Sequence, residues 1–143
     1  MIEITEKPLD AEAITAKVKR DTNGAVVTFL GITRRFSEGR TVLYLEYEAY
    51  NDMALKKLSQ IHQEILQEWA IEEVAIAHRI GRLEIEETSL VVAVASPHRK
   101  DAFLACHKVV DRIKEIVPIW KKEIFEDGSA WVESNYPETS PFH

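Results

Sequence analysis

The chain has 143 residues and a mass of 16.4 kDa, which suits one globular domain with its own hydrophobic core. Its 24 acidic and 18 basic side chains leave a net charge of −6 and a pI near 5.4, which argues against general nucleic-acid binding. Its one cysteine, Cys106, excludes an internal disulfide and a multi-thiolate metal site.

The amino-terminal segment predicts a strand, a helix and a second strand. Ile2 and Ile4 alternate with polar neighbours, as in a short strand. Asp10 is placed to cap a helix that runs to about Arg20. A turn at Asn23-Gly24 then leads into a buried strand over residues 25–31.

The next segment predicts a mobile loop followed by a long strand. Residues 33–40 (TRRFSEGR) are polar, charged and contain glycine, so we expect a mobile loop. Residues 42–50 alternate as a strand does. The apolar residues expected on its one face are Leu43, Leu45, Tyr47 and Ala49.

Helical spacing dominates the middle of the sequence. Asn51 or Asp52 is expected to cap a helix that runs to about Trp69. Its apolar stripe is Ala54, Leu58, Ile61, Ile65 and Trp69. Strands are expected over 74–80 and 90–95, separated by a polar stretch at 81–89.

The carboxy-terminal part predicts a helix and a hairpin. Ser96 as N-cap and Pro97 as the first helical residue favour a helix that ends at Glu115 or Ile116, before Pro118. Residues 119–125 and 130–133 are typical of a hairpin, closed around Asp127-Gly128.

These elements predict an α+β fold, a layered arrangement without regular doubly wound alternation. With no linker or repeat, we expect residues 1–143 to form a single compact domain with an irregular tail at 136–143. The amino terminus lacks the features of a signal peptide, and the longest apolar run, 90–95, is far below the roughly 20 residues that span a bilayer. We therefore expect a cytoplasmic protein that binds neither membranes nor nucleic acid.

Basic residues gather in two clusters despite the acidic average. Arg34-Arg35, with Arg40, lies in the polar segment, where paired guanidinium groups can clamp an anion; a solvated loop is the simpler interpretation. His98-Arg99-Lys100 follows Ser96-Pro97, and the N–H groups of a helix start attract anions. Ordinary surface charge is the alternative for this cluster too.

Three lysines near the carboxyl terminus are candidates for chemistry. Lys114 lies at the edge of an apolar helix stripe, where partial burial would make its amine usable for proton transfer. Alternatively, its stem simply covers the core while the amine reaches water. Lys121 and Lys122 face opposite sides of a strand, so at most one enters a pocket shared with Lys114. A charged edge strand is the competing interpretation.

The remaining candidates have structural interpretations. The five histidines have no metal-binding spacing, and no phosphate-binding, dinucleotide-binding or hydrolase motif is present, so we expect no metal and no cofactor. His78, at the end of an apolar strand, is interpreted as a structural histidine with its hydrogen bonds satisfied. Cys106 falls in a helix stripe and is interpreted as inert core.

Several motifs, in this order and spacing, resemble the MoaE family, the large, catalytic subunits of molybdopterin synthase. The resemblance runs from about residue 3 to 135. The motifs are residues 24–34 (GAVVTFLGITR), 45–50 (LEYEAY) with Met53-Ala54, 78–81 (HRIG), 96–99 (SPHR), Lys114, 120–123 (WKKE), Gly128 and 131–133 (WVE).

The resemblance implies a sulfurtransferase of molybdenum cofactor biosynthesis with a hammerhead-like α/β fold. Such enzymes convert cyclic pyranopterin monophosphate into molybdopterin by forming a dithiolene. Their donor is a small ubiquitin-like subunit whose carboxy-terminal Gly-Gly bears a thiocarboxylate. Two large subunits form a homodimer within a heterotetramer. The alternative is a receptor for the pterin phosphate or the Gly-Gly tail that performs no chemistry.

The resemblance also assigns residues. Lys114 and Lys121 match the catalytic lysines of the family. The matches to its substrate contacts are Ile32, Thr33, Arg34, His98, Arg99, Lys114, Lys121, Lys122 and Glu123. Asn135 stands where some relatives carry an arginine that reaches the neighbouring subunit, so that contact is in doubt.

Overall fold

A computed structural model describes residues 1–134; the expected tail at 136–143 and Asn135 lie outside the described residues. The described residues form three helices and nine strands. The helices are α1 (Ala11–Ala16), α2 (Asn51–Glu68) and α3 (Arg99–Ile116). The strands are β1 (Ile2–Thr5), β2 (Ala25–Ile32), β3 (Phe36–Ser37), β4 (Arg40–Ala49), β5 (Val74–Arg79), β6 (Gly81–Glu84), β7 (Thr88–Ser96), β8 (Ile119–Phe125) and β9 (Ala130–Ser134).

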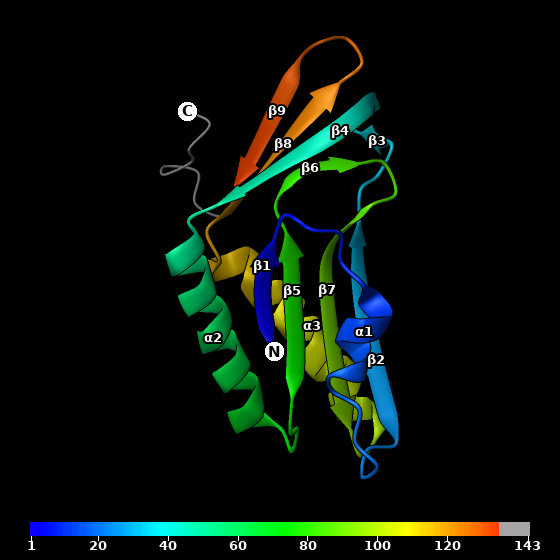
Figure 1. The fold of residues 1–143 in the computed structure, drawn as a ribbon, viewed down its shortest axis with the longest axis vertical. Coiled ribbons are helices and arrows are strands. Elements are labelled where there is room, and N and C mark those ends of the chain that lie inside the picture. Colours follow the sequence, from blue (N-terminus) through cyan, green and yellow to red (C-terminus); the bar gives the residue numbers. More distant parts are fainter. Residues whose placement is uncertain (135–143) are drawn as a thin grey trace.

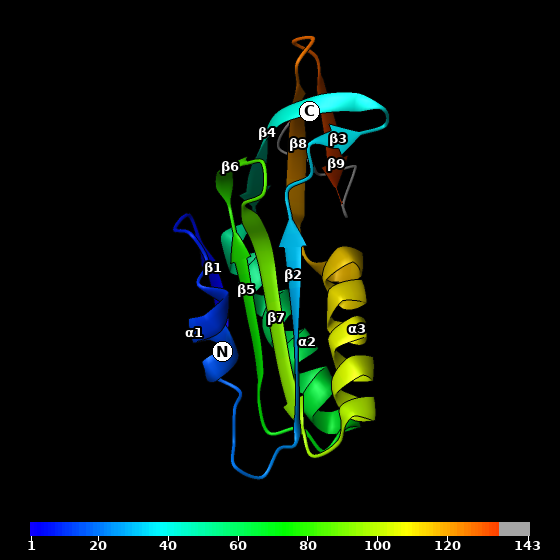
Figure 2. The same cartoon turned by 90° about the vertical axis from the view of Figure 1, so that its right-hand side faces the viewer.

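A mixed sheet with the strand order β1-β5-β7-β2 forms the centre of the molecule. β1 runs parallel to β5, and the other neighbours are antiparallel. Helices α2 and α3 cover one face and α1 covers the other, so side chains on both faces of β5 and β7 are buried (Figures 1 and 2). This explains why both strands are nearly continuous apolar runs.

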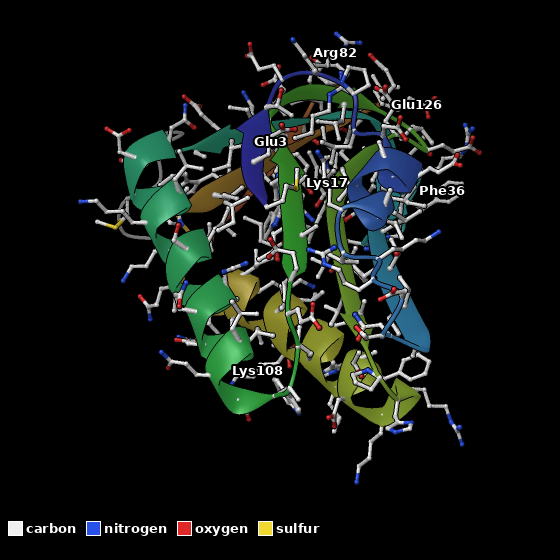
Figure 3. All side chains as sticks on the ribbon, turned by 60° about the horizontal axis from the view of Figure 1, so that its bottom comes forward. Glu3, Lys17, Phe36, Arg82, Lys108 and Glu126 are labelled. Atoms are coloured by element: carbon white, nitrogen blue, oxygen red, sulfur yellow. The ribbon has the colours of Figure 1, made fainter. Side chains whose placement is uncertain are left out.

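The two long helices pack through the apolar stripes that their spacing predicts. In α2 the buried residues are Ala54, Leu58, Ile61 and Ile65. In α3 they are Ala102, Ala105, Cys106, Val109 and Ile113. Charged side chains connect the two helices at their edges: Arg112 contacts Glu64 through two hydrogen bonds of 2.9 Å. Lys108, labelled in Figure 3, pairs with Glu68.

A second sheet lies across one end of the first (Figure 1). Its strand order is β3-β4-β8-β9, and β6 also pairs with β4. Trp120 and Phe125 of β8 are almost completely buried, which anchors this sheet. The chain enters β8 directly from the end of α3, so the carboxyl end of that helix lies beside the second sheet (Figure 2).

The predicted helix starts are partly wrong. Asp10 caps α1 as expected and accepts a 3.0 Å hydrogen bond from the Ala13 amide. The helix ends at Ala16, because the next amides, of Lys17 and Val18, donate to carbonyls only three residues earlier in the chain. The N-cap of α2 is Tyr50, and that of α3 is His98; neither makes a side-chain capping bond. Ser96 instead ends β7 and accepts a hydrogen bond from the His98 amide at 3.2 Å.

Two polar segments expected to lack strands contain them. Within 33–40, the short strand β3 pairs with β4 across Glu38-Gly39, whose positive φ angles form a tight turn. Within 81–89, β6 pairs with β4. Both strands are short and polar. The partner of β6 is distant in sequence, and β3 pairs with the strand that turns back on it. Local apolar spacing therefore does not reveal them.

The face predicted for β4 is also partly wrong. Leu43 is 47% exposed, whereas Val42 and Leu45 are buried. The register with β8 shifts between Val42 and Tyr44, so one extra residue is inserted and the alternation of faces is interrupted.

The mixed α+β fold class is confirmed. Among the described residues, no helix combines the length and the apolar character needed to cross a bilayer.

Candidate functional site

A cleft of about 340 Å³ opens where the first sheet, the end of α3 and the second sheet meet. This volume falls within the range of small-molecule sites in proteins. The cleft contains three of the residues predicted to bind substrate, which are Ile32, Lys114 and Lys121. Its other lining residues are Phe29, Gly31, Tyr47, His78, Ser89, Leu90, Ile113, Ile119 and Glu133.

Strand register places Lys121 in the cleft. On β8 it lies opposite Tyr47 of β4 and opposite Glu133 of β9, so the three side chains share one face of the sheet. Its Nζ atom is 3.3 Å from Oε2 of Glu133, in an ion pair at the partly exposed edge of the cleft.

Lys114 reaches the same cleft from the last turn of α3. A cation is favoured there because the carbonyl end of a helix carries partial negative charge. The side chain is exposed, and within residues 1–134 it has no ion-pair partner. We call Lys114, Lys121 and Glu133 the rim of the cleft.

The floor of the cleft, formed by Tyr47, His78 and Ser89, is polar but uncharged. His78 is 6% exposed, and burial lowers its pKa to about 4 against the opposing effect of the Arg79 carbonyl, so its imidazole is neutral at pH 7. Its Nδ1 lies 2.8 Å from that carbonyl oxygen, and the Tyr47 ring meets it edge to face. Burial also raises the pKa of Tyr47, and the neighbouring Ser89 hydroxyl opposes that shift.

The segment after β2 lies beside the cleft. Ile32 lines it, and Thr33 is 3% exposed, held through backbone hydrogen bonds to Glu86 and Glu87. Thr33 Oγ1 is buried without a hydrogen-bond partner among the described residues. Arg34 follows with an exposed side chain, two residues from the cleft wall.

His98 and Arg99 lie at the opposite end of α3 from Lys114 (Figure 2). At 1.5 Å per residue, about 22 Å of helix separates Arg99 from Lys114. The chain therefore does not bring these predicted substrate contacts to its own cleft.

The last two predicted contacts lie outside the cleft wall. Lys122 points to the opposite face of β8 from Lys121. Glu123 is 6% exposed and accepts a 3.1 Å hydrogen bond from the Ser37 hydroxyl, which ties β3 to β8.

Two further candidates have structural surroundings. Arg40 pairs with Asp127 at 3.1 Å and lies over the Phe125 ring, so it does not join Arg34 and Arg35 in a clamp. Cys106 is buried, and burial raises its pKa to about 11, which confirms it as a protonated core thiol. The described residues hold no group of three or more His, Cys, Asp or Glu side chains placed to bind a metal.

The sequence did not single out Tyr47, Ser89 or Glu133 as site residues. Their spacing along the chain carries no signal, because strand pairing alone places Tyr47 and Glu133 beside Lys121. The alternation of β4 gave the face of Tyr47, but not the neighbour it meets there.

Comparison with known proteins gives consistent matches. The family model described as MoaE protein matches residues 4–116. The molybdopterin synthase catalytic subunit of Halalkalibacterium halodurans is 48% identical, over 96% of this chain and 92% of the relative. That of Bacillus subtilis is 47% identical, over 96% and 88%. The crystal structure of molybdopterin synthase from Staphylococcus aureus superimposes with a TM-score of 0.87 and 46% identity, covering 92% of this chain and 95% of that one.

Proposed function

Because this chain belongs to the MoaE protein family, we propose that it performs the sulfur transfer of a molybdopterin synthase catalytic subunit in molybdenum cofactor biosynthesis. Its substrate is cyclic pyranopterin monophosphate, which it converts into molybdopterin by installing the two sulfurs of the dithiolene. The family resemblance and the identity to the catalytic subunits support this assignment. The reaction takes place in the cytoplasm.

The sulfur donor is a small ubiquitin-like subunit whose Gly-Gly carboxyl terminus carries a thiocarboxylate. Cys106 supports a donor outside this chain, because the only thiol is buried and protonated. Two copies of the chain form a homodimer, and each binds one donor subunit to give a heterotetramer.

The observation that carries the catalytic assignment is the convergence of Lys114 and Lys121 on one cleft from different elements. Both ammonium groups lie on the rim, where they orient the anionic thiocarboxylate and stabilise negative charge that develops during transfer. One of them also moves protons. The thiocarboxylate sulfur forms a carbon–sulfur bond to the pterin side chain as an oxygen substituent leaves that carbon and takes up a proton, which gives an acyl-thio intermediate. Water then cleaves its acyl–sulfur bond, leaving the sulfur on the pterin and a carboxylate on the donor.

The phosphate of the substrate needs cations beyond the rim. Arg34 stands next to Ile32 and Thr33 at the cleft edge. His98 and Arg99 lie about 22 Å along α3 from Lys114, so a second copy of the chain supplies them to this cleft. Lys122 and Glu123 lie outside the cleft wall of their own chain, and Glu123 acts on the site through the β3 hairpin that it holds.

A single-turnover reaction tests the function. The chain is mixed with the thiocarboxylated small subunit and cyclic pyranopterin monophosphate, and sulfur in the pterin is measured by mass spectrometry. Lys121→Ala is expected to reduce transfer at least about a thousandfold while leaving the melting temperature unchanged, because it removes charge stabilisation at the reacting group. Lys56→Ala, an exposed change on α2, is the matched control.

Transfer by Lys121→Ala at the rate of the control would remove Lys121 from the mechanism. A stable complex in which the unaltered chain transfers no sulfur would make the protein a receptor rather than an enzyme.

A further inference from the structure

On the floor of the cleft, the protons that Ser89 and His78 can donate are already used within the protein. The Ser89 hydroxyl donates to the Gly31 carbonyl at 3.2 Å. A hydroxyl has one proton, so the Ser89 oxygen keeps only lone pairs to offer to a ligand.

His78 is held in the same condition. A carbonyl oxygen only accepts, so the contact with Arg79 places the imidazole proton on Nδ1. Nε2, on the other side of the ring, is then unprotonated and accepts hydrogen bonds. Among the described residues, Nε2 has no protein partner. Only Thr33 Oγ1 among their side-chain polar atoms is both fully buried and without a hydrogen bond, so Nε2 is not fully buried. It therefore opens to the cleft that His78 lines.

The backbone keeps this floor open. At Gly31 a Cβ atom would lie 3.3 Å from the Ser89 oxygen and 3.4 Å from the Leu90 Cβ. A side chain at this position would crowd the Ser89 hydroxyl, and the glycine leaves the space beside it for a ligand.

The two lysines of the rim have the opposite polarity to the floor. The ammonium groups of Lys114 and Lys121 are donors without acceptor capacity, and they attract anions. A fitting ligand thus carries negative charge at one end and hydrogen-bond donors at the other, with an apolar body against Phe29, Leu90 and Ile119.

We propose that the floor is a specificity subsite for the N–H groups of a fused nitrogen heterocycle, with His78 Nε2 and the Ser89 oxygen as its acceptors. The proposal rests on the pterin chemistry proposed above and adds the residues that choose the orientation of the ring. A heterocycle that presents methylated nitrogens to the floor leaves the acceptors there without a donor, and one that presents oxo groups sets acceptors against acceptors. Both are therefore rejected.

Calorimetric titration with two probes tests the subsite. Pterin and an N-methylated pterin, both without phosphate, are titrated into the chain in complex with the unactivated small subunit. The unaltered protein is expected to prefer pterin by at least about tenfold, the discrimination of one well-formed hydrogen bond. His78→Phe keeps a ring against Tyr47 but removes the acceptor, and its preference is expected to fall to nearly one.

Inorganic phosphate is titrated as the internal control. Its affinity is expected to be the same in His78→Phe and the unaltered chain, because the floor does not contact the anion. Ser89→Ala, which removes the second acceptor, is expected to lower the pterin preference as well, and it tests the proposal even where His78→Phe does not fold.

A preference for pterin that stays tenfold in the folded variants would overturn the proposal. So would an unaltered chain that binds both probes equally. Failure of the proposed function shows itself separately, as absence of sulfur in the pterin during single turnover with the unaltered chain.

Discussion

At the scale of single residues, His78 shows how burial defines chemistry. Its position at the end of a buried strand fits the structural interpretation, and its Nδ1 is satisfied by the Arg79 carbonyl. The same bond fixes the tautomer and leaves Nε2 as an acceptor in the cleft. Desolvation keeps the ring neutral across the physiological range.

The lowered pKa of His78 predicts a contribution to acid sensitivity. The unfolded imidazole titrates near 6.5 and the folded one near 4, so between these values the unfolded chain binds more protons. The free energy of unfolding therefore falls as the pH drops from 6.5 towards 4. This residue alone contributes a loss of about 3 kcal/mol.

Urea unfolding of the unaltered chain and of His78→Phe at pH 7, 5.5 and 4.5 measures this contribution. Glu64, Glu73 and Glu87 also have lowered pKa values and lose stabilisation in acid, but they are common to both proteins and cancel in the difference. Equal pH slopes for the two proteins would contradict the prediction.

At the scale of elements, close approach between backbone segments constrains the sequence as much as the periodicity of apolar residues does. Gly24 precedes β2, and its amide donates to the Pro97 carbonyl at 3.3 Å, which joins the start of β2 to the segment between β7 and α3. A Cβ at this position would lie 2.9 Å from that carbonyl oxygen. Because the obstacle is backbone, it has no side-chain rotamer by which to move away.

Gly24→Ala is expected to lower the free energy of unfolding by about 1–3 kcal/mol, the usual range for overpacking. Thermal and urea unfolding measure the change. Asp21→Ala, an exposed substitution in the same loop, serves as the control and is expected to stay within about 0.5 kcal/mol of the unaltered chain. Equal stability of the two variants would show that the segment at Pro97 adjusts without strain.

At the scale of the whole molecule, the proposed substrate contacts separate into two groups. Lys114 and Lys121 share the cleft, whereas His98 and Arg99 lie at the far end of α3. A two-fold pair of chains resolves this separation if each copy supplies its helix start to the cleft of the other, as symmetric dimers allow.

Complementation between inactive variants tests this arrangement. Lys121→Ala and Arg99→Ala are each expected to be strongly impaired when expressed alone. When they are co-expressed, a mixed dimer contains one cleft with both residues intact, so random pairing restores roughly a quarter of the unaltered activity. No recovery in mixed dimers isolated through two affinity tags would place Arg99 outside the shared site.

The sequence by itself determined the α+β class, the two long helices with their buried stripes and most of the strands, because apolar spacing reports directly which face of an element is buried. It also determined, through the family resemblance, which lysines to consider. Short polar strands such as β3 and β6 escaped it, since they are strands through their pairing with β4 and have no apolar spacing of their own. The bulge at Leu43 escaped for the same reason.

Only the tertiary structure decided the site. Strand register set Tyr47, Lys121 and Glu133 side by side, although more than 70 residues separate the first two in the chain. Burial turned His78 into a neutral acceptor, and the length of α3 moved His98 away from the cleft. Distances between elements and the loss of water around a side chain depend on how the whole chain packs, and local sequence does not encode either one.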